Sequence, residues 1–133
     1  MSKNITTHMA SEIASIPDLT RNLLKTGRAS AEQFGLRLRT KNPSVVTTIA
    51  RGSSDHASAY LKYVIELTLG IPVASTGPSI SSVYGAPLHL EQAATIAISQ
   101  SGESPDIIAM TQTALDGGSL VLSLTNNSTS PLA

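Results

Sequence analysis

Apolar residues follow two different spacings along the chain, and the change from one to the other predicts where helices give way to strands. From residue 8 to residue 40 they recur every three or four positions, in HMASEIASIP, DLTRNLLKTG and SAEQFGLRLRT, as on one face of a helix. Pro17 follows the first of these runs, so we expect it to interrupt the helix or to begin the next one. Ser30 with Gln33 three residues later has the pattern of a capping box and is the expected start of the last helix.

The remainder of the chain alternates between continuous apolar runs and helical spacing. Four runs are rich in β-branched or uninterrupted apolar residues, as strands buried on both faces are: SVVTTIA (44–50), IPVAST (71–76), ATIAIS (94–99) and SLVLSLT (119–125). Helices are expected between them, at 53–69 and from Ser104 to 118, and PSISSVYG (78–85) is predicted as one or two helical turns.

The helix at 53–69 has signals at both ends. Ser53 or Ser54 is the expected N-cap, and Gly70 followed by Pro72 is typical of a C-terminus. Its inner stripe is predicted to be Ala57, Leu61, Val64 and Leu67 or Thr68.

Strands that alternate with helices at this spacing predict right-handed crossovers and a parallel sheet with helices on both faces. The expected fold class is therefore α/β, with a doubly wound parallel sheet. In such sheets ligands bind at the carboxyl ends of the strands, near the switch in strand order. The loops RGSSDH (51–56) and SQSGESPD (99–106) leave the first and third strands at that edge, so the candidate site lies there.

Composition narrows the class of protein. A chain of 133 residues is expected to form one domain. The sequence contains no cysteine, which excludes disulfides, thiolate zinc sites and a cysteine nucleophile in these residues and predicts a cytoplasmic location. No run approaches the ~20 apolar residues of a membrane span, and the first residues lack the apolar core of a signal peptide. No membrane partner is expected.

Charge is balanced overall but uneven along the chain. Of the nine basic residues seven lie in the first 41 positions, whereas no Lys or Arg occurs from Tyr63 onward. Nucleic-acid binding is not expected, because these basic residues are not interleaved with aromatic ones and Phe34 is the one aromatic residue among them. An anion bound by the second half must be held mainly without cationic side chains.

Each of the two loops supplies a glycine, hydroxyls and a helix N-terminus, which together make an anion site suited to phosphate. Ser104-Pro105 has the pattern of an N-cap followed by proline at the first helical position. The alternative is that the serines only cap helices. Three acidic residues nearby would repel a dianion unless their side chains point away or meet sugar hydroxyls: Asp55, Glu103 and Asp106.

Two further candidates have open roles. Arg51 either contacts the phosphate or pairs with Asp55, and His56 either faces the ligand or is a structural donor. The P-loop spacing is missing and RGSSDHA lacks the spacing of dinucleotide sites, so no nucleotide cofactor is expected. His8, His56 and His89 are far apart without a carboxylate at ligand spacing, so no metal is expected either.

Three segments carry a family resemblance: ARGSSDHASAYLKYVIELTLGIPV, SVYG and ISQSGESPDI. They resemble the sugar isomerase (SIS) domain, specifically the first of two such domains in the isomerase part of glucosamine-6-phosphate synthase relatives. The resemblance extends over nearly the whole chain from Met9. It implies a flavodoxin-like, three-layer α/β/α fold, a sugar-phosphate ligand and association into a homodimer.

The resemblance also implies which residues bind the phosphosugar: Ser53, Ser54, Ser99, Gln100, Ser101 and Ser104, with Arg51, Gly52, His56, Gly102 and Glu103 as further candidates. In the synthases the first loop usually reads Cys-Gly-Thr-Ser. Arg51-Gly52-Ser53-Ser54 departs from that pattern, and the cysteine nucleophile of the synthases is missing, so the chain looks closest to stand-alone isomerase-type glucosamine-6-phosphate deaminases.

Family members keep their acid–base glutamate, histidine and lysine in a second SIS domain, which this chain lacks. Residues 1–41 are therefore expected to form lead-in helices and 42–133 a phosphosugar-binding SIS domain that is truncated before its fifth strand, so whether the chain is itself an enzyme stays open. The expected function is the binding half of an isomerase, deaminase or aminotransferase acting on hexosamine 6-phosphates such as glucosamine 6-phosphate or fructose 6-phosphate. The alternative is a non-catalytic sugar-phosphate sensor.

Overall fold

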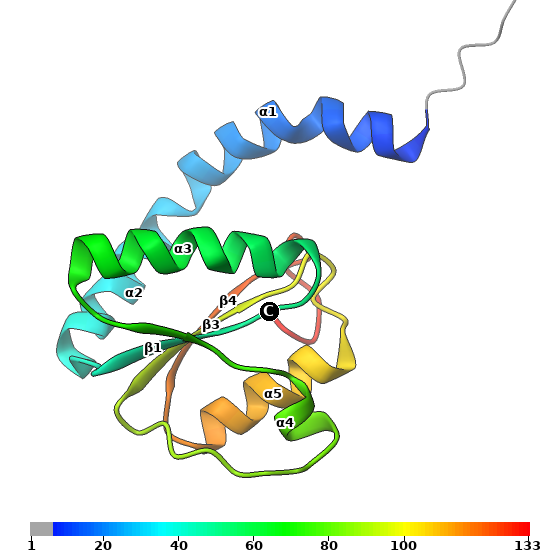
Figure 1. Ribbon diagram of the computed structural model, residues 1–133. Coiled ribbons are helices and arrows are strands. Elements are labelled where there is room, and N and C mark those ends of the chain that lie inside the picture. Colours follow the sequence, from blue (N-terminus) through cyan, green and yellow to red (C-terminus); the bar gives the residue numbers. More distant parts are fainter. Residues whose placement is uncertain (1–6) are drawn as a thin grey trace, which may run out of the picture. The chain divides into compact units, whose positions relative to one another are not determined.

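A computed structural model of the chain describes residues 7–133 (Figure 1). Residues 1–6, the start of the predicted lead-in segment, lie outside the described residues. The elements in chain order are α1 (His8–Thr26), α2 (Arg28–Lys41), β1 (Val45–Ile49), α3 (Ser53–Leu69), β2 (Val73–Ser75), α4 (Ser79–Ser82), β3 (Ala93–Ile98), α5 (Pro105–Asp116) and β4 (Leu120–Leu124). They fall into two compact units, of which the first ends at Leu36 and the second is Arg37–Ala133.

The first unit is helical as predicted, but the helix boundary lies elsewhere. α1 continues through Pro17, which removes only one backbone donor, and ends at Gly27, whose N–H donates to the Leu23 carbonyl at 2.8 Å. A Cβ on Gly27 would lie 2.8 Å from that same oxygen, so glycine suits the break. α2 begins at Arg28, which places Ser30 inside the helix, and the predicted capping box is wrong.

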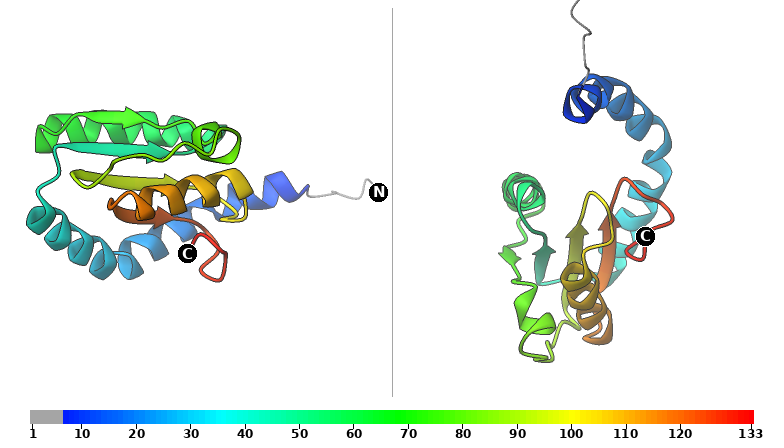
Figure 2. Two further views of the ribbon diagram at one scale, coloured as in Figure 1. Left: turned by 90° about the horizontal axis from the view of Figure 1, so that it is seen from below. Right: turned by 90° about the vertical axis from the view of Figure 1, so that its right-hand side faces the viewer.

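The second unit is built on a parallel sheet of the order β2-β1-β3-β4, with Val46 opposite Val73 and Ile49 opposite Ala97. This confirms the α/β fold class and the predicted parallel sheet. Figures 1 and 2 show α3 on one side of the sheet and α5 with α4 on the other, as right-handed crossovers require. The strands run in the same direction, so the loops after β1, β3 and β4 emerge at one edge.

The core between the sheet and α5 is apolar and tightly closed. Ile49, Ala97, Ile107, Met110 and Ala114 are buried there, together with Leu132 from the C-terminal segment. Burying a side chain as large as Ile or Met contributes about 1.5–3 kcal/mol, so this cluster holds α5 firmly against β1 and β3. The start of α5 is thereby fixed relative to the end of β1.

A chain of buried hydroxyls crosses the sheet from β1 through β3 to the start of β4. Thr47 and Thr95 oxygens lie 2.8 Å apart on β1 and β3, and Thr95 and Ser119 oxygens lie 2.7 Å apart. Ser119 donates in turn to the Ala93 carbonyl at 3.2 Å. Buried hydroxyls are tolerated because each finds a partner.

α3 ends at Gly70 as predicted, but its inner face differs in part from the prediction. Gly70 is the left-handed C-cap, with φ 67° and its N–H on the Glu66 carbonyl at 3.2 Å. The buried residues of the helix are Ser58 and Ile65, whereas Tyr60 is 74% exposed and Leu67 83% exposed. The predicted stripe is right at Leu61, which is half-buried, and wrong at Ala57, Val64 and Leu67, which are exposed. The helix carries apolar residues on two sides, and its packing on the sheet decides which side is buried.

Candidate phosphate-binding site

The β1–α3 loop turns sharply at Gly52, which has φ 57° and is the N-cap of α3. Ser53 and Ser54 are therefore the first two residues of the helix, and the prediction that one of them caps it is wrong. Their hydroxyls and N–H groups donate no hydrogen bond to any residue from 7 to 133. This leaves them as donors at the positive end of a helix dipole, where an anion is stabilised.

The β3–α5 loop folds on its own serines. Buried Ser99 accepts a hydrogen bond at its Oγ from the Gly102 N–H at 3.2 Å, and Ser101 Oγ accepts from the Glu103 N–H at 3.2 Å. Gly102 is buried and has φ 67°, a conformation that favours glycine. Each of the two hydroxyls is used as an acceptor, so its own proton stays available for a ligand oxygen.

α5 begins as predicted, with Ser104 at the N-cap and Pro105 at the first helical position. The Ser104 hydroxyl makes no capping hydrogen bond, and the exposed Gln100 side chain has no partner in the described part of the chain. The side chains of Gln100 and Ser104 are thus at the same loop, with donor groups that the fold itself does not use.

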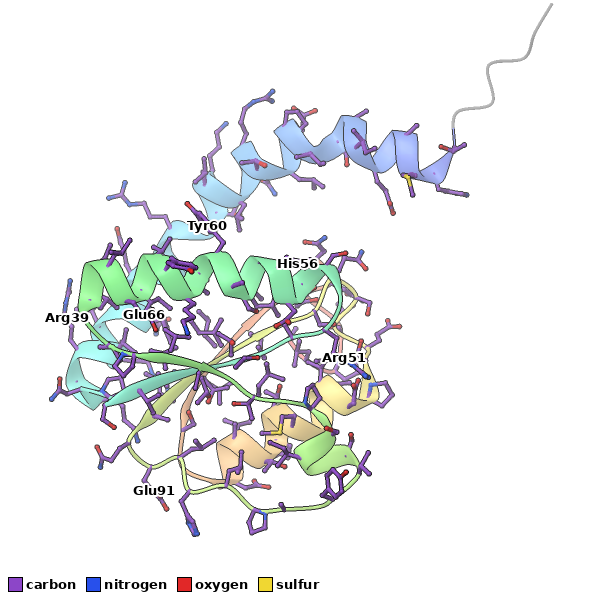
Figure 3. The ribbon with its side chains drawn as sticks, in the orientation of Figure 1. Arg39, Arg51, His56, Tyr60, Glu66 and Glu91 are labelled. Carbon is purple, nitrogen blue, oxygen red and sulfur yellow. The ribbon has the colours of Figure 1, made fainter. Side chains whose placement is uncertain are left out.

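Arg51 has a role that neither sequence hypothesis foresaw. Its guanidinium forms an ion pair with the carboxylate of Asp106 in the first turn of α5, and Figure 3 shows Arg51 beside the start of that helix. The predicted alternative with Asp55 is wrong. Asp106 is only 19% exposed, and the Arg51 guanidinium neutralises its charge. Asp55 and Glu103 are exposed to water.

The remaining candidates from the sequence are the histidines and a metal site. His56 is exposed, and Figure 3 places it toward the N-terminal end of α3. His89 is near a carboxylate, 3.8 Å from Glu91, at the far end of β3. Among residues 7–133 no cluster of three or more His, Asp or Glu residues is arranged to hold a metal ion. Within the same residues no helix is long and apolar enough to cross a membrane.

A third loop lies against the β3–α5 loop, and the sequence reasoning missed its part in the site. Thr125–Ala133, which follows β4, donates a hydrogen bond from the Asn126 N–H to the Gln100 carbonyl at 3.2 Å. It donates another from the Leu132 N–H to the Gly102 carbonyl at 3.2 Å. The signal was present as a run of Thr, Asn and Ser directly after the fourth strand.

Two cavities of the structure lie away from the serines of the candidate loops. One cavity of about 370 Å³ is lined by residues between 81 and 117 that include Leu88, Glu91 and Asp116. Another of about 280 Å³ lies beside β4 and α5. The serines of the two candidate loops line neither of them.

In this parallel sheet, adjacent strands end in serine-rich loops at helix N-termini. That arrangement is typical of α/β domains that bind anions. Comparisons with known proteins identify the family. The chain belongs to the SIS-domain family, whose model matches residues 40–133. It is 36% identical over 104 residues to the glutamine–fructose-6-phosphate aminotransferase (isomerizing) of Symbiobacterium thermophilum. That match covers 78% of this chain and 16% of the relative.

Solved structures agree on the fold. A protein of Silicibacter pomeroyi DSS-3 assigned as a phosphosugar isomerase has a TM-score of 0.87 and is 51% identical, over 92% of this chain and 37% of its own. The C-terminal domain of glucosamine-fructose-6-phosphate aminotransferase from Francisella tularensis has a TM-score of 0.76 at 22% identity, over 99% of this chain and 38% of its own, and supports the fold alone. The chain thus spans less than two fifths of each of these proteins.

Proposed function

We propose that this chain is the phosphosugar-binding half of an enzyme that acts on hexosamine 6-phosphates, with glucosamine 6-phosphate or fructose 6-phosphate as its ligand. One observation carries the proposal: the neighbouring strands β1 and β3 end in two loops that hold donors without an acceptor among residues 7–133. These donors are the serine hydroxyls of both loops and the N–H groups of Ser53, Ser54 and Ser101. Such donors at helix N-termini match the three acceptor oxygens of a phosphate. The names of the similar proteins, an aminotransferase of fructose 6-phosphate and a phosphosugar isomerase, support the same ligand class.

The roles follow from position. We assign the phosphate to Ser54, Ser99, Ser101 and Ser104, with Ser53 and Gln100 beside them. Gly52 and Gly102 allow the backbone to approach the ligand closely, since neither carries a side chain. Arg51 acts indirectly, by neutralising Asp106. We assign the exposed Glu103 and His56 to sugar hydroxyls rather than to the phosphate.

The reaction belongs to the part of the enzyme that this chain does not span. The site on residues 7–133 offers hydroxyls and N–H groups as donors for binding. We place the chain in the deaminase-like branch because its first loop reads Arg-Gly-Ser-Ser. A lead-in segment at 1–41 followed by the binding domain at 42–133, a dimeric assembly and a cytoplasmic location are part of the same proposal.

Calorimetry on the purified chain tests the ligand. We expect glucosamine 6-phosphate and fructose 6-phosphate to bind far more tightly than glucosamine or fructose, because the phosphate supplies the charge-assisted hydrogen bonds. Ser54→Ala should weaken both phosphorylated ligands, whereas Ser11→Ala on α1 is a matched control. Equal affinity for sugar and sugar phosphate would contradict the proposal.

A further inference from the structure

The segment Thr125–Ala133, which we call the strap, lies along the β3–α5 loop. Its backbone N–H groups at Asn126 and Leu132 donate to the carbonyls of Gln100 and Gly102, at 3.2 Å each. A third contact comes from the Thr125 hydroxyl, 3.4 Å from the Gln100 carbonyl. The strap therefore determines which way two peptide planes of the loop face.

Those peptide planes determine where the loop's donors point. In a trans peptide the C=O and the following N–H point in opposite directions. With the Gln100 carbonyl turned to the strap, the Ser101 N–H points away from it, and this N–H has no acceptor in the described part of the chain. With the Gly102 carbonyl turned to the strap, the Glu103 N–H reaches Ser101 Oγ at 3.2 Å.

The strap is anchored in the core near its C-terminal end, and nearer β4 it is folded by hydrogen bonds of its own. Leu132 is 6% exposed and packs in the core cluster with Ala97 and Met110. Nearer β4, the Asn127 side chain accepts hydrogen bonds from the Thr129 N–H at 3.0 Å and the Thr129 hydroxyl at 2.8 Å. A segment fixed in this way can hold the loop instead of following it.

Ser130 lies against the loop at Gly102. It is 8% exposed, and its Oγ is enclosed without a hydrogen-bond partner in the structure. A Cβ placed on Gly102 would lie 2.6 Å from the Ser130 Cβ and 2.8 Å from Thr125 Oγ1, and closer still to Ser130 Oγ. The Ser130 side chain thus packs directly on the Gly102 backbone, which is bonded to Ser99 and flanked by Ser101.

We propose that Ser130 is a positioning residue, which by packing on Gly102 holds the Ser99–Ser104 loop in the conformation that binds the phosphate. This inference rests on the proposed function. A buried hydroxyl without a partner is unfavourable, and its place against Gly102 gives a reason for a side chain of that size there. A smaller side chain leaves the loop loose, and a larger one displaces it.

The test is a size series at residue 130, with glucosamine 6-phosphate as the probe in calorimetry. We expect Ser130→Val to weaken binding at least tenfold, and Ser130→Ala, which keeps the Cβ contact, at least threefold. Thermal unfolding should show that Ser130→Ala is as stable as the parent chain or more so, since the unpartnered hydroxyl is gone. Backbone amide resonances of Ser101, Gly102 and Glu103 should shift in both variants.

The control is Ser128→Ala, an exposed serine of the strap, which should change neither the affinity nor those resonances. Unchanged affinity in a folded Ser130→Val variant would overturn the inference, and so would an equal loss in Ser128→Ala. Should Ser130→Val not fold, Ser130→Ala decides alone, and parent-like affinity overturns the inference. Failure of the parent chain to bind glucosamine 6-phosphate would instead count against the proposed function.

Discussion

Arg51 and Asp106 form an ion pair that joins the end of β1 to the first turn of α5. The two residues are 55 positions apart, and they connect the two loops assigned to the phosphate. The pair neutralises the charge of Asp106, one of the three carboxylates near the loops that would repel an incoming dianion. It also directs the guanidinium to the first turn of α5, where it neutralises the Asp106 carboxylate.

Opposite effects are predicted for the two partners of this pair. Arg51→Ala should weaken sugar-phosphate binding, because it leaves the 19% exposed Asp106 carboxylate uncompensated near the phosphate. Asp106→Asn should strengthen binding, since it removes a negative charge and releases Arg51. Stability should change by only about 0–1 kcal/mol, because the Arg51 side chain is 69% exposed and screened by water.

Calorimetry at low and high salt checks this prediction, and both differences should shrink as salt rises. A loss of affinity in both variants would instead show that Arg51 contacts the phosphate directly and needs Asp106 to hold it in place.

Ser101→Ala is predicted to lower the affinity for sugar phosphate by about 1–3 kcal/mol, the loss of a charge-assisted hydrogen bond in a partly buried site. The variant also loses the oxygen that accepts from the Glu103 N–H, so its thermal stability should be measured alongside. An unchanged affinity with a lower melting temperature would mean that Ser101 serves only the turn.

Gly102→Ala should destabilise the fold more than Gly52→Ala, although both glycines have positive φ, at 67° and 57°. At Gly52 an added Cβ has no heavy atom within 4 Å, so the cost is the backbone strain of about 1–2 kcal/mol. At Gly102 the Cβ also collides with Ser130 and Thr125, which adds about 1–3 kcal/mol. Urea unfolding of the two variants gives the comparison, and equal losses would contradict the packing described for the strap.

Much of the fold could be predicted from the sequence because its signals are local. Continuous apolar runs identified the strands, Gly70 the end of α3, and Ser104-Pro105 the start of α5. Which face of α3 is buried could not be fully predicted, since Ile65 and Leu67 are both strongly apolar. The packing of the helix on the sheet decides which of the two is buried. The break at Gly27 instead of Pro17 was missed because one lost donor does not end a helix.

The candidate loops were found for the same local reason, but their connections were not. Glycines, serines and helix starts are visible in a short stretch of sequence. The pairing of Arg51 with Asp106, and of the strap with Gln100 and Gly102, joins residues far apart in the chain. Only the register of the parallel sheet brings these segments to one edge.

β4 is an edge strand of the sheet, and its exposure leads to a prediction about assembly. Val121 and Ser123 are half-buried, Leu124 is 42% exposed, and no Lys or Pro occurs between Ser119 and Leu124 to oppose pairing with another chain. The cavity of about 280 Å³ lined by Val121, Ser123 and Leu132 runs beside this strand. An edge of this composition tends to recruit a further strand.

The chain is therefore predicted to associate in solution, and light scattering at micromolar concentration should detect a dimer or a larger species. Ser123→Lys should reduce that association, because a charged side chain on an edge strand opposes pairing. Ser128→Lys introduces the same charge outside β4 and should leave association unchanged. A parent chain that stays monomeric at high concentration, with a cooperative melt, would show that the β4 edge is covered by other residues of the same chain.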